Sequence, residues 1–189
     1  ESIGDWNPGA VPLTQATPTT WQKTIEVLDG ASLEFKFTRG DWETVMKGAD
    51  GNEELANLTL TVDYDEDGTQ YYEYTVLNWR DPIVVAVSPP EGALGVRLNA
   101  AVVTYWSQAM SPESCFSLTD HRCDVPGTCS YNDVEKSITF TPDSRLKPMK
   151  TYTATASELI DYGGDIQQVV KTWTFKTKAY QNRRPFDFK

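Results

Sequence analysis

Few residues of this chain could perform catalysis at neutral pH. His121 is the single histidine, and no Gly-x-Ser-x-Gly nucleophile turn occurs in the 189 residues. Asp and Glu number 27, so counting alone leaves a glycosidase-type carboxylate pair open, but two sandwiches of about 90 residues rarely frame the cleft that such a pair needs. A histidine base also needs a nucleophile or a metal within hydrogen-bond reach, and no motif supplies one. We therefore expect that the protein is not an enzyme and carries no cofactor.

An acidic turn holds the residues that best match a metal site. Asp63, Asp65 and Asp67 place carboxylates at alternate positions before Gly68, as at the start of a calcium-binding loop. The twelfth position of such a loop needs a bidentate Glu, and Tyr74 stands there. An acidic hairpin turn with Gly68 at a positive φ accounts for the same residues. We favour the hairpin turn and expect no metal ion; calcium is the alternative.

The three cysteines, Cys115, Cys123 and Cys129, lie within one short stretch. An odd number allows at most one internal disulfide and leaves one thiol over. Cys115 and Cys129 would face each other across a hairpin centred near Arg122, so the pair 115–129 is the preferred disulfide. The alternative is three reduced cysteines in a cytosolic protein. The spacing does not fit a zinc ribbon.

Composition and charge exclude two classes of partner. The formal net charge is −10, from 27 acidic and 17 basic residues. Binding to phosphate requires Lys and Arg that displace counterions, so we expect neither nucleic acid nor anionic lipid as a partner. The longest apolar runs, such as residues 83–87, are far shorter than the roughly 20 residues of a membrane-spanning helix. We expect no membrane insertion.

The chain reads as all-β, because short segments alternate apolar and polar residues and are separated by Gly, Pro, Asn and Asp. No sustained helical stripe occurs. The expected strands cover residues 21–28, 32–38, 58–64, 70–78, 101–106, 137–141, 151–156 and 169–177. Four tryptophans inside or at the ends of these patterns are expected to be core residues: Trp21, Trp79, Trp106 and Trp173.

A domain boundary is expected at Arg80, Asp81 and Pro82, because Pro82 cannot donate to a ladder and a new pattern starts after it. The length also favours two domains of about 90 residues. We expect one β-sandwich over residues 1–81, a second over 82–178, and a tail over 179–189 whose last residues alternate like a strand.

Residues 1–81 resemble starch-binding domains of the family-20 carbohydrate-binding type. The resemblance rests on Ile3 to Pro8 (IGDWNP), Trp21, residues 30–37 (GASLEFKF), residues 38–42 (TRGDW) and residues 79–81 (WRD). It implies an antiparallel sandwich that binds α-glucans without catalysis. Flat aromatic faces would stack on pyranose rings, and polar side chains would fix their orientation.

The resemblance implies a sugar site made of Trp6, Lys36 and Asn57. The family has a second Trp shortly before an Asn-Arg pair, but here Leu58 stands at the Arg position and residues 45–56 contain no Trp. Trp42 is the candidate for that role. The alternative is that Trp6 closes the end of the sandwich and Trp42 is only a hairpin-tip residue. Asn57 also begins an Asn-Leu-Thr glycosylation triplet, which would compete with sugar binding.

Residues 82–178 resemble bacterial Ig-like domains of surface proteins. The matching segments are residues 87–93 (VSPPEGA), 106–112 (WSQAMSP), 140–142 (FTP), 146–148 (LKP), 151–153 (TYT) and 173–177 (WTFKT). Together the two resemblances imply a non-catalytic binding and spacer module, extracellular or at the cell surface, with an α-glucan as the ligand class.

A second function follows from the front of the chain. The starch-binding family has one or two strands before the Gly-Asp-Trp turn, whereas Gly4 follows only three residues here. Either residues preceding Glu1 supply these strands, or another chain pairs with the exposed sheet edge. Residues 185–189 are a candidate donor strand. The alternative function is therefore a structural subunit of an extracellular fibre that self-associates by strand complementation.

Overall fold

The computed structural model describes residues 4–121 and 123–180. The all-β class predicted from the sequence is confirmed: the described residues form fourteen strands, and their one helical element is the single-turn 3-10 helix η1 (Trp42–Thr44). No helix among the described residues has the length and apolarity needed to cross a membrane. The chain divides into two compact units, Glu1–Asp81 (unit 1) and Pro82–Lys189 (unit 2). The expected donor strand at residues 185–189 lies outside the described residues.

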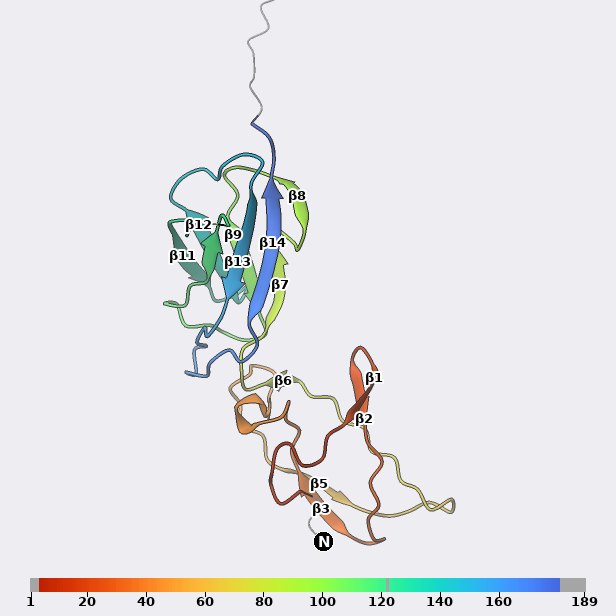
Figure 1. The fold of residues 1–189 in the computed structure, drawn as a ribbon. Coiled ribbons are helices and arrows are strands. Elements are labelled where there is room, and N and C mark those ends of the chain that lie inside the picture. The colour runs from red at the N-terminus through yellow and green to blue at the C-terminus, as the bar shows by residue number, and fades with distance from the viewer. Residues whose placement is uncertain (1–3, 122, 181–189) are drawn as a thin grey trace, which may run out of the picture. The chain divides into compact units, whose positions relative to one another are not determined.

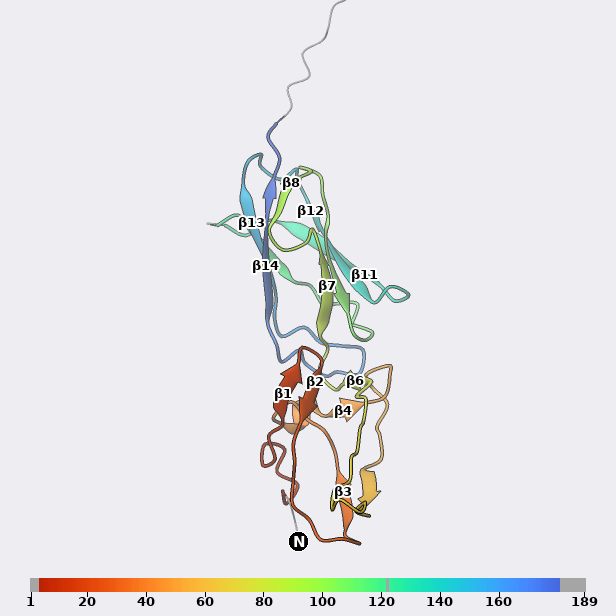
Figure 2. The same cartoon turned by 90° about the vertical axis from the view of Figure 1, so that its right-hand side faces the viewer.

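Unit 2 is a sandwich of two four-stranded sheets, whose layers are visible in Figure 1 and, turned by 90°, in Figure 2. One sheet has the order β10-β13-β14-β8 and the other β11-β12-β9-β7. Neighbouring strands are antiparallel except β14 and β8, which are parallel. The strands are β7 (Val84–Ser88), β8 (Ala93–Val96), β9 (Val102–Trp106), β10 (Ser117–Thr119), β11 (Gly127–Asn132), β12 (Ser137–Pro142), β13 (Thr151–Ala156) and β14 (Lys171–Thr177).

The core of unit 2 lies between its sheets. Alternation places every second side chain inward, as in β13, where Tyr152 and Ala154 are buried. Trp173 is 1% exposed and packs 5.5 Å from Phe116, centroid to centroid. Trp106 is also buried, and its indole Nε1 donates to Thr104 Oγ1 at 2.9 Å. The sequence therefore placed Trp106 and Trp173 in the core correctly.

A disulfide joins Cys115 to Cys129, with their Cα atoms 5.5 Å apart. The expected geometry was wrong, because the two cysteines do not lie opposite each other in one hairpin ladder. The hairpin is limited to a bridge between Thr119 and Asp124, and Arg122, its expected centre, lies outside the described residues. Cys115 precedes β10 in one sheet and Cys129 belongs to β11 in the other, so the disulfide connects the two layers.

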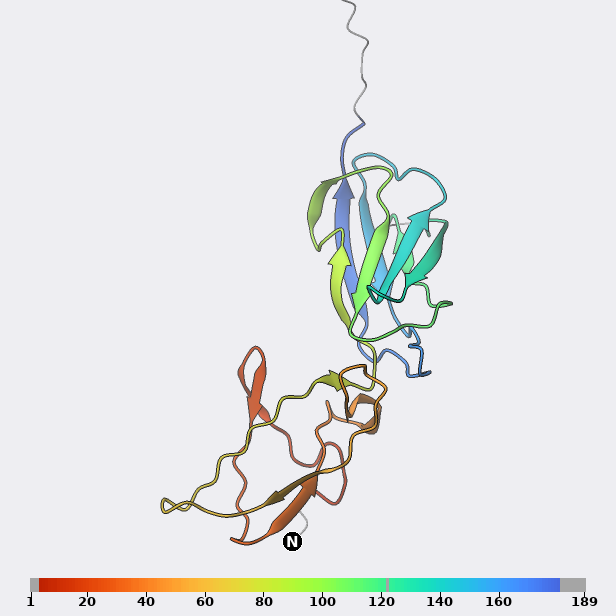
Figure 3. The same ribbon diagram turned by 180° about the vertical axis from the view of Figure 1, so that it is seen from behind.

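In residues 4–81, the sheets of unit 1 are all two-stranded antiparallel ladders: β1 with β2, β3 with β5, and β4 with β6. Figure 3 shows long connections between these short strands. The strands are β1 (Thr14–Thr17), β2 (Thr20–Gln22), β3 (Ser32–Phe35), β4 (Met46–Lys47), β5 (Leu58–Thr61) and β6 (Asn78–Trp79).

Unit 1 buries little apolar surface. Its fully buried hydrophobic residues are Val45, Met46 and Val62. Trp21 was expected in the core and is 52% exposed, so that prediction was wrong. The reason is that β2 pairs only with β1, and all seven residues of this ladder are exposed. Trp79 is half-buried beneath Arg39, whose guanidinium carbon lies 5.4 Å from the ring centroid.

Candidate functional site

A tight turn at the start of unit 1 presents Trp6. The Asn7 amide donates to the Gly4 carbonyl at 2.8 Å, closing the turn. Asp5 and Trp6 both have left-handed backbone conformations, with φ of 47° and 56°. Such a conformation is rare for a bulky side chain and costs of order 1–3 kcal/mol, so it persists only where the surroundings impose it. The turn leaves the Trp6 ring 50% exposed.

Trp42 lies beside Trp6. The two ring centroids are 6.3 Å apart with 29° between the ring planes, and Trp42 is 39% exposed. Trp42 opens η1, and the turn before it is tied to the Trp6 loop because Thr38 Oγ1 donates to the Pro8 carbonyl at 3.0 Å. Two half-exposed indoles held together form an apolar surface, here called the tryptophan pair, of the kind that stacks on sugar rings.

Lys36 and Asn57 lie on the β3–β5 ladder and its continuation. Asn57 Nδ2 donates to Glu34 Oε1 at 2.8 Å. Lys36 follows β3 directly, two positions after Glu34, and its charge contributes to lowering the pKa of Glu54. Among the described contacts, none joins Lys36 or Asn57 to the tryptophan pair. The structure thus brings Trp6 and Trp42 together, whereas the described interactions of Asn57 and Lys36 are with the carboxylates of Glu34 and Glu54.

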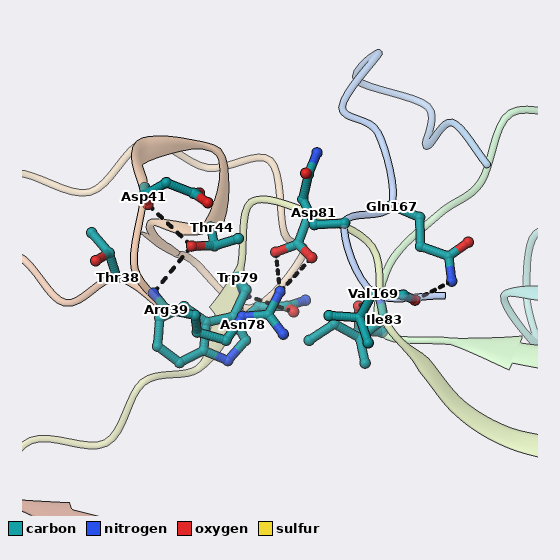
Figure 4. Close-up of polar contacts among 12 residues, drawn as sticks. Thr38, Arg39, Asp41, Thr44, Asn78, Trp79, Asp81, Ile83, Gln167 and Val169 are labelled. Atoms are coloured by element: carbon teal, nitrogen blue, oxygen red, sulfur yellow. Dashed lines mark hydrogen bonds and ion pairs between the residues drawn. The ribbon is translucent and has the colours of Figure 1, made fainter. Parts of the chain in front are cut away.

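An ion pair that the sequence analysis did not identify supports the turn before Trp42. Figure 4 shows the Arg39 guanidinium donating to both carboxylate oxygens of Asp81, which is completely buried. The Arg39 amide also donates to Thr44 Oγ1 at 3.1 Å, across η1. Arg39 is thus fixed at the base of the turn that carries Trp42. Asp81 was interpreted as a linker residue because it precedes Pro82, and no local pattern relates positions 39 and 81.

A second ion pair in unit 1 gives a pH dependence. Lys47 is almost fully buried in β4, and its ammonium group donates to Glu54 Oε1. This hydrogen bond, and then the Lys47 charge, lower the pKa of Glu54 below its ordinary value of 4.5. The folded state therefore binds fewer protons than the unfolded state near that pH. The stabilisation is complete above the ordinary value and is lost as the pH falls through the lower, folded-state pKa.

We expect Glu54→Gln to destabilise unit 1 at pH 7, by less than about 1 kcal/mol because the Glu54 side chain is exposed. The difference from the wild-type chain should disappear at a pH well below 4.5, where Glu54 is protonated in both states. Urea unfolding between pH 7 and pH 3 measures this difference. Glu53→Gln is the matched control. A Glu54→Gln effect that is the same at every pH would contradict the assignment.

The acidic turn is organised by hydrogen bonds within it. Asp67 accepts from the Thr69 hydroxyl at 2.6 Å and from the Thr69 amide at 3.0 Å, and these bonds lower the pKa of the Asp67 carboxyl. Gly68 has φ of 73°, the left-handed conformation that the turn requires. In residues 4–121 and 123–180, no three His, Cys, Asp or Glu side chains are grouped to hold a metal ion.

The free cysteine and the single histidine of the chain lie in one loop of unit 2. Cys123 is exposed and outside the disulfide, and His121 has a left-handed φ of 77°. A hollow of about 390 Å³ beside this loop is lined by Asp120 and Lys147, among others. Lys147 Nζ donates to Asp120 Oδ2 at 2.7 Å, which raises the Lys147 pKa. These two charges therefore neutralise each other at the wall of the hollow.

Comparison with known proteins gives partial matches. Two amylopullulanases resemble parts of the chain: one from Thermoanaerobacter thermohydrosulfuricus is 36% identical over 86 residues, and one from Thermoanaerobacterium thermosulfurigenes is 31% identical over 84 residues. These matches cover 46% and 44% of this chain but only 6% and 4% of the enzymes. A solved structure of surface layer protein SbsC, domains 1–6, aligns with a TM-score of 0.39 and 19% identity, over 52% of this chain and 14% of that one.

The strongest assignment concerns unit 2. The bacterial Ig-like domain family matches residues 79–177, which are more than half of the chain. This region includes all eight strands of the sandwich, from β7 to β14. Ig-like domains of this type are non-catalytic modules. The chain belongs to the bacterial Ig-like domain family.

Proposed function

We propose that the chain is a non-catalytic binding module of an extracellular or cell-surface protein, and that unit 1 binds an α-glucan through Trp6 and Trp42. The observation that carries the proposal is the tryptophan pair, whose half-exposed rings lie 6.3 Å apart on two linked turns. Stacking on a sugar needs aromatic faces that are fixed before binding, because ordering a mobile side chain costs free energy. The left-handed Trp6 backbone and the Arg39 ion pair provide this order.

The relatives agree with this ligand class. Both are amylopullulanases, enzymes named for α-glucan substrates, and the match covers a small part of each, as expected for an accessory module. Lys36 and Asn57 would contribute hydrogen bonds at the edge of the site only if a bound oligosaccharide extends from the tryptophan pair to β3 and β5. Trp6 and Trp42 are therefore the primary contacts in this proposal.

An oxidising location agrees with the disulfide. Structural disulfides persist in secreted and surface proteins and are rare in the cytosol. The Cys115–Cys129 bond connects the two sheets of unit 2, where it restricts the unfolded chain and stabilises the folded one. A reduced cytosolic protein would lose this contribution.

We expect Trp6→Ala and Trp42→Ala each to weaken binding of maltoheptaose by roughly tenfold or more, because each removes one stacking face. Isothermal titration calorimetry measures the dissociation constants. Trp21→Ala is the matched control. The Trp21 ring is 52% exposed in the same unit but belongs to the β1–β2 ladder, so this variant should bind maltoheptaose as tightly as the wild-type chain. Equal affinities for all four chains, or no binding by the wild-type chain, would refute the α-glucan site.

A second candidate function is favoured by the incomplete packing of unit 1. Its ladders are two-stranded, and large apolar side chains remain exposed, including Leu28 at 74% and Tyr71 at 90%. Exposed strand edges beside apolar surface are where other chains add strands. We therefore also propose a structural role, in which unit 1 accepts a strand from a neighbouring copy in an extracellular fibre.

A further inference from the structure

Two extended segments of unit 1, residues 23–28 and 71–77, have strand-like sequences but belong to no ladder in the described structure. Segment 71–77 returns from the acidic turn toward β6, as Figure 3 shows. Its Tyr72 and Tyr74 rings contact Phe35 and Phe37 of the β3 strand and its continuation, at centroid distances of 5.7 and 5.8 Å. The segment therefore lies against β3 through its side chains, while its backbone remains available for pairing.

Exposure along residues 73–77 alternates as in a strand that packs on one side only: Tyr74 and Val76 are partly buried, whereas Glu73, Thr75 and Leu77 are exposed. Tyr71 and Tyr72 before them are both exposed, at 90% and 44%. Segment 23–28 is exposed at every position except the half-buried Val27, whose carbonyl accepts from the Tyr64 hydroxyl. A strand added along segment 71–77 would gain main-chain hydrogen bonds and would cover apolar side chains at the same time.

We propose that residues 184–189 of a second copy of this chain bind as a strand to segment 71–77, which contacts β3 and its continuation through its side chains. This rests on the second candidate function and names its donor and acceptor. The donor sequence Arg-Pro-Phe-Asp-Phe-Lys places Phe186 and Phe188 on one face, and six residues are a typical strand length. Pro185 is compatible with the start of an edge strand, where its missing N–H is tolerated.

Charge selects this donor. Residues 1–81 contain 16 Asp and Glu against 5 Lys and Arg, a net charge of −11, whereas residues 184–189 carry a net charge of +1. Glu73 is exposed within the acceptor segment 71–77, which contains no basic residue. Arg184 and Lys189 of the donor would lie near this carboxylate, and opposite charges across a β-pair are favourable. A donor on one copy and an acceptor on the next make a head-to-tail contact that propagates into a fibre.

The test compares the full chain with a full-length Phe186→Ser, Phe188→Ser double variant. Light scattering should show large assemblies of the wild-type chain and a monomeric double variant. A labelled peptide of residues 181–189 should bind the double variant and slow amide exchange in residues 71–77. Glu73→Lys should weaken peptide binding by about tenfold, and the matched control Glu113→Lys, on an exposed site of unit 2, should not.

Two results would overturn the assignment. If the wild-type chain stays monomeric and the peptide does not bind, these residues are not a donor strand. If assemblies persist in the double variant, or protection appears in unit 2, another segment mediates contact and the fibre function stands without this donor. Loss of maltoheptaose binding in Trp6→Ala is measured separately on the monomeric double variant, so failure of the sugar site and failure of the strand exchange are distinguished.

Discussion

Trp173→Ala is expected to lower the free energy of unfolding of unit 2 by about 3–5 kcal/mol, the usual cost of truncating a fully buried Trp. Trp173 is 1% exposed in the central strand β14, and its ring contacts Phe116. Alanine would leave a cavity between the two sheets that rigid neighbouring strands cannot close. Urea unfolding, monitored by amide hydrogen exchange in β13 and β14, measures the free energy of unfolding of unit 2 alone.

Trp173→Phe distinguishes the cost of the cavity from any contribution of the indole N–H. The buried Nε1 of Trp173 has no hydrogen-bond partner among the described protein atoms, so replacing it with carbon removes no bond. We expect Trp173→Phe to cost clearly less than Trp173→Ala. Val134→Ala is the surface control, because Val134 is 93% exposed, and it should change stability by less than about 0.5 kcal/mol. Equal costs for Trp173→Ala and Val134→Ala would show that this side chain is not in the core.

Asp81→Ala is expected to destabilise unit 1 by about 1.5–3 kcal/mol, because it removes the charge-assisted hydrogen bonds to Arg39, whose side chain is 27% exposed and can be partly rehydrated. The ion pair connects the turn at residues 38–44 to the segment that follows β6, so its loss should also release the turn that holds Trp42. Sugar binding should weaken together with stability. Chemical unfolding and maltoheptaose titration of the same variant measure the two effects.

A double-mutant cycle tests whether the two charges act as a pair. Arg39→Ala should cost more than Asp81→Ala, about 3–5 kcal/mol, because it leaves the buried Asp81 carboxylate unpaired. The double variant should cost much less than the sum, because each single variant already loses the interaction. Asp41→Asn is the matched control, since Asp41 is exposed in the same turn and should change stability by less than about 0.5 kcal/mol. Additive costs would show that Arg39 and Asp81 are not energetically coupled.

Four of the eight strands of unit 2 could be predicted closely from the sequence. The expected segments 101–106, 137–141, 151–156 and 169–177 correspond to β9, β12, β13 and β14 within two residues at each end. In these strands the alternating pattern coincides with a buried face, because the opposite sheet covers it. Local pattern and tertiary environment agree there, and one sequence is enough to locate the elements.

The same kind of pattern was misleading in unit 1. Residues 21–28 and 70–78 alternate as well as any strand of unit 2, yet only their ends pair, in β2 and β6. A segment becomes a β-strand only when it pairs with a second segment through backbone hydrogen bonds, and its alternating pattern does not specify that partner. Trp21 was expected to be buried for the same reason and is exposed, because no layer covers its ladder.

The sequence by itself determined the all-β class, four strands of unit 2 and the aromatic residues that we propose stack on a sugar. Only the tertiary structure placed Trp6 against Trp42, paired Arg39 with Asp81, and showed that Cys115 and Cys129 join two sheets and not two strands of one hairpin. Alternation and turn residues act over a few positions and are readable along the chain. Contacts between positions 6 and 42, or 39 and 81, depend on how loops close in space, and no local pattern encodes that distance.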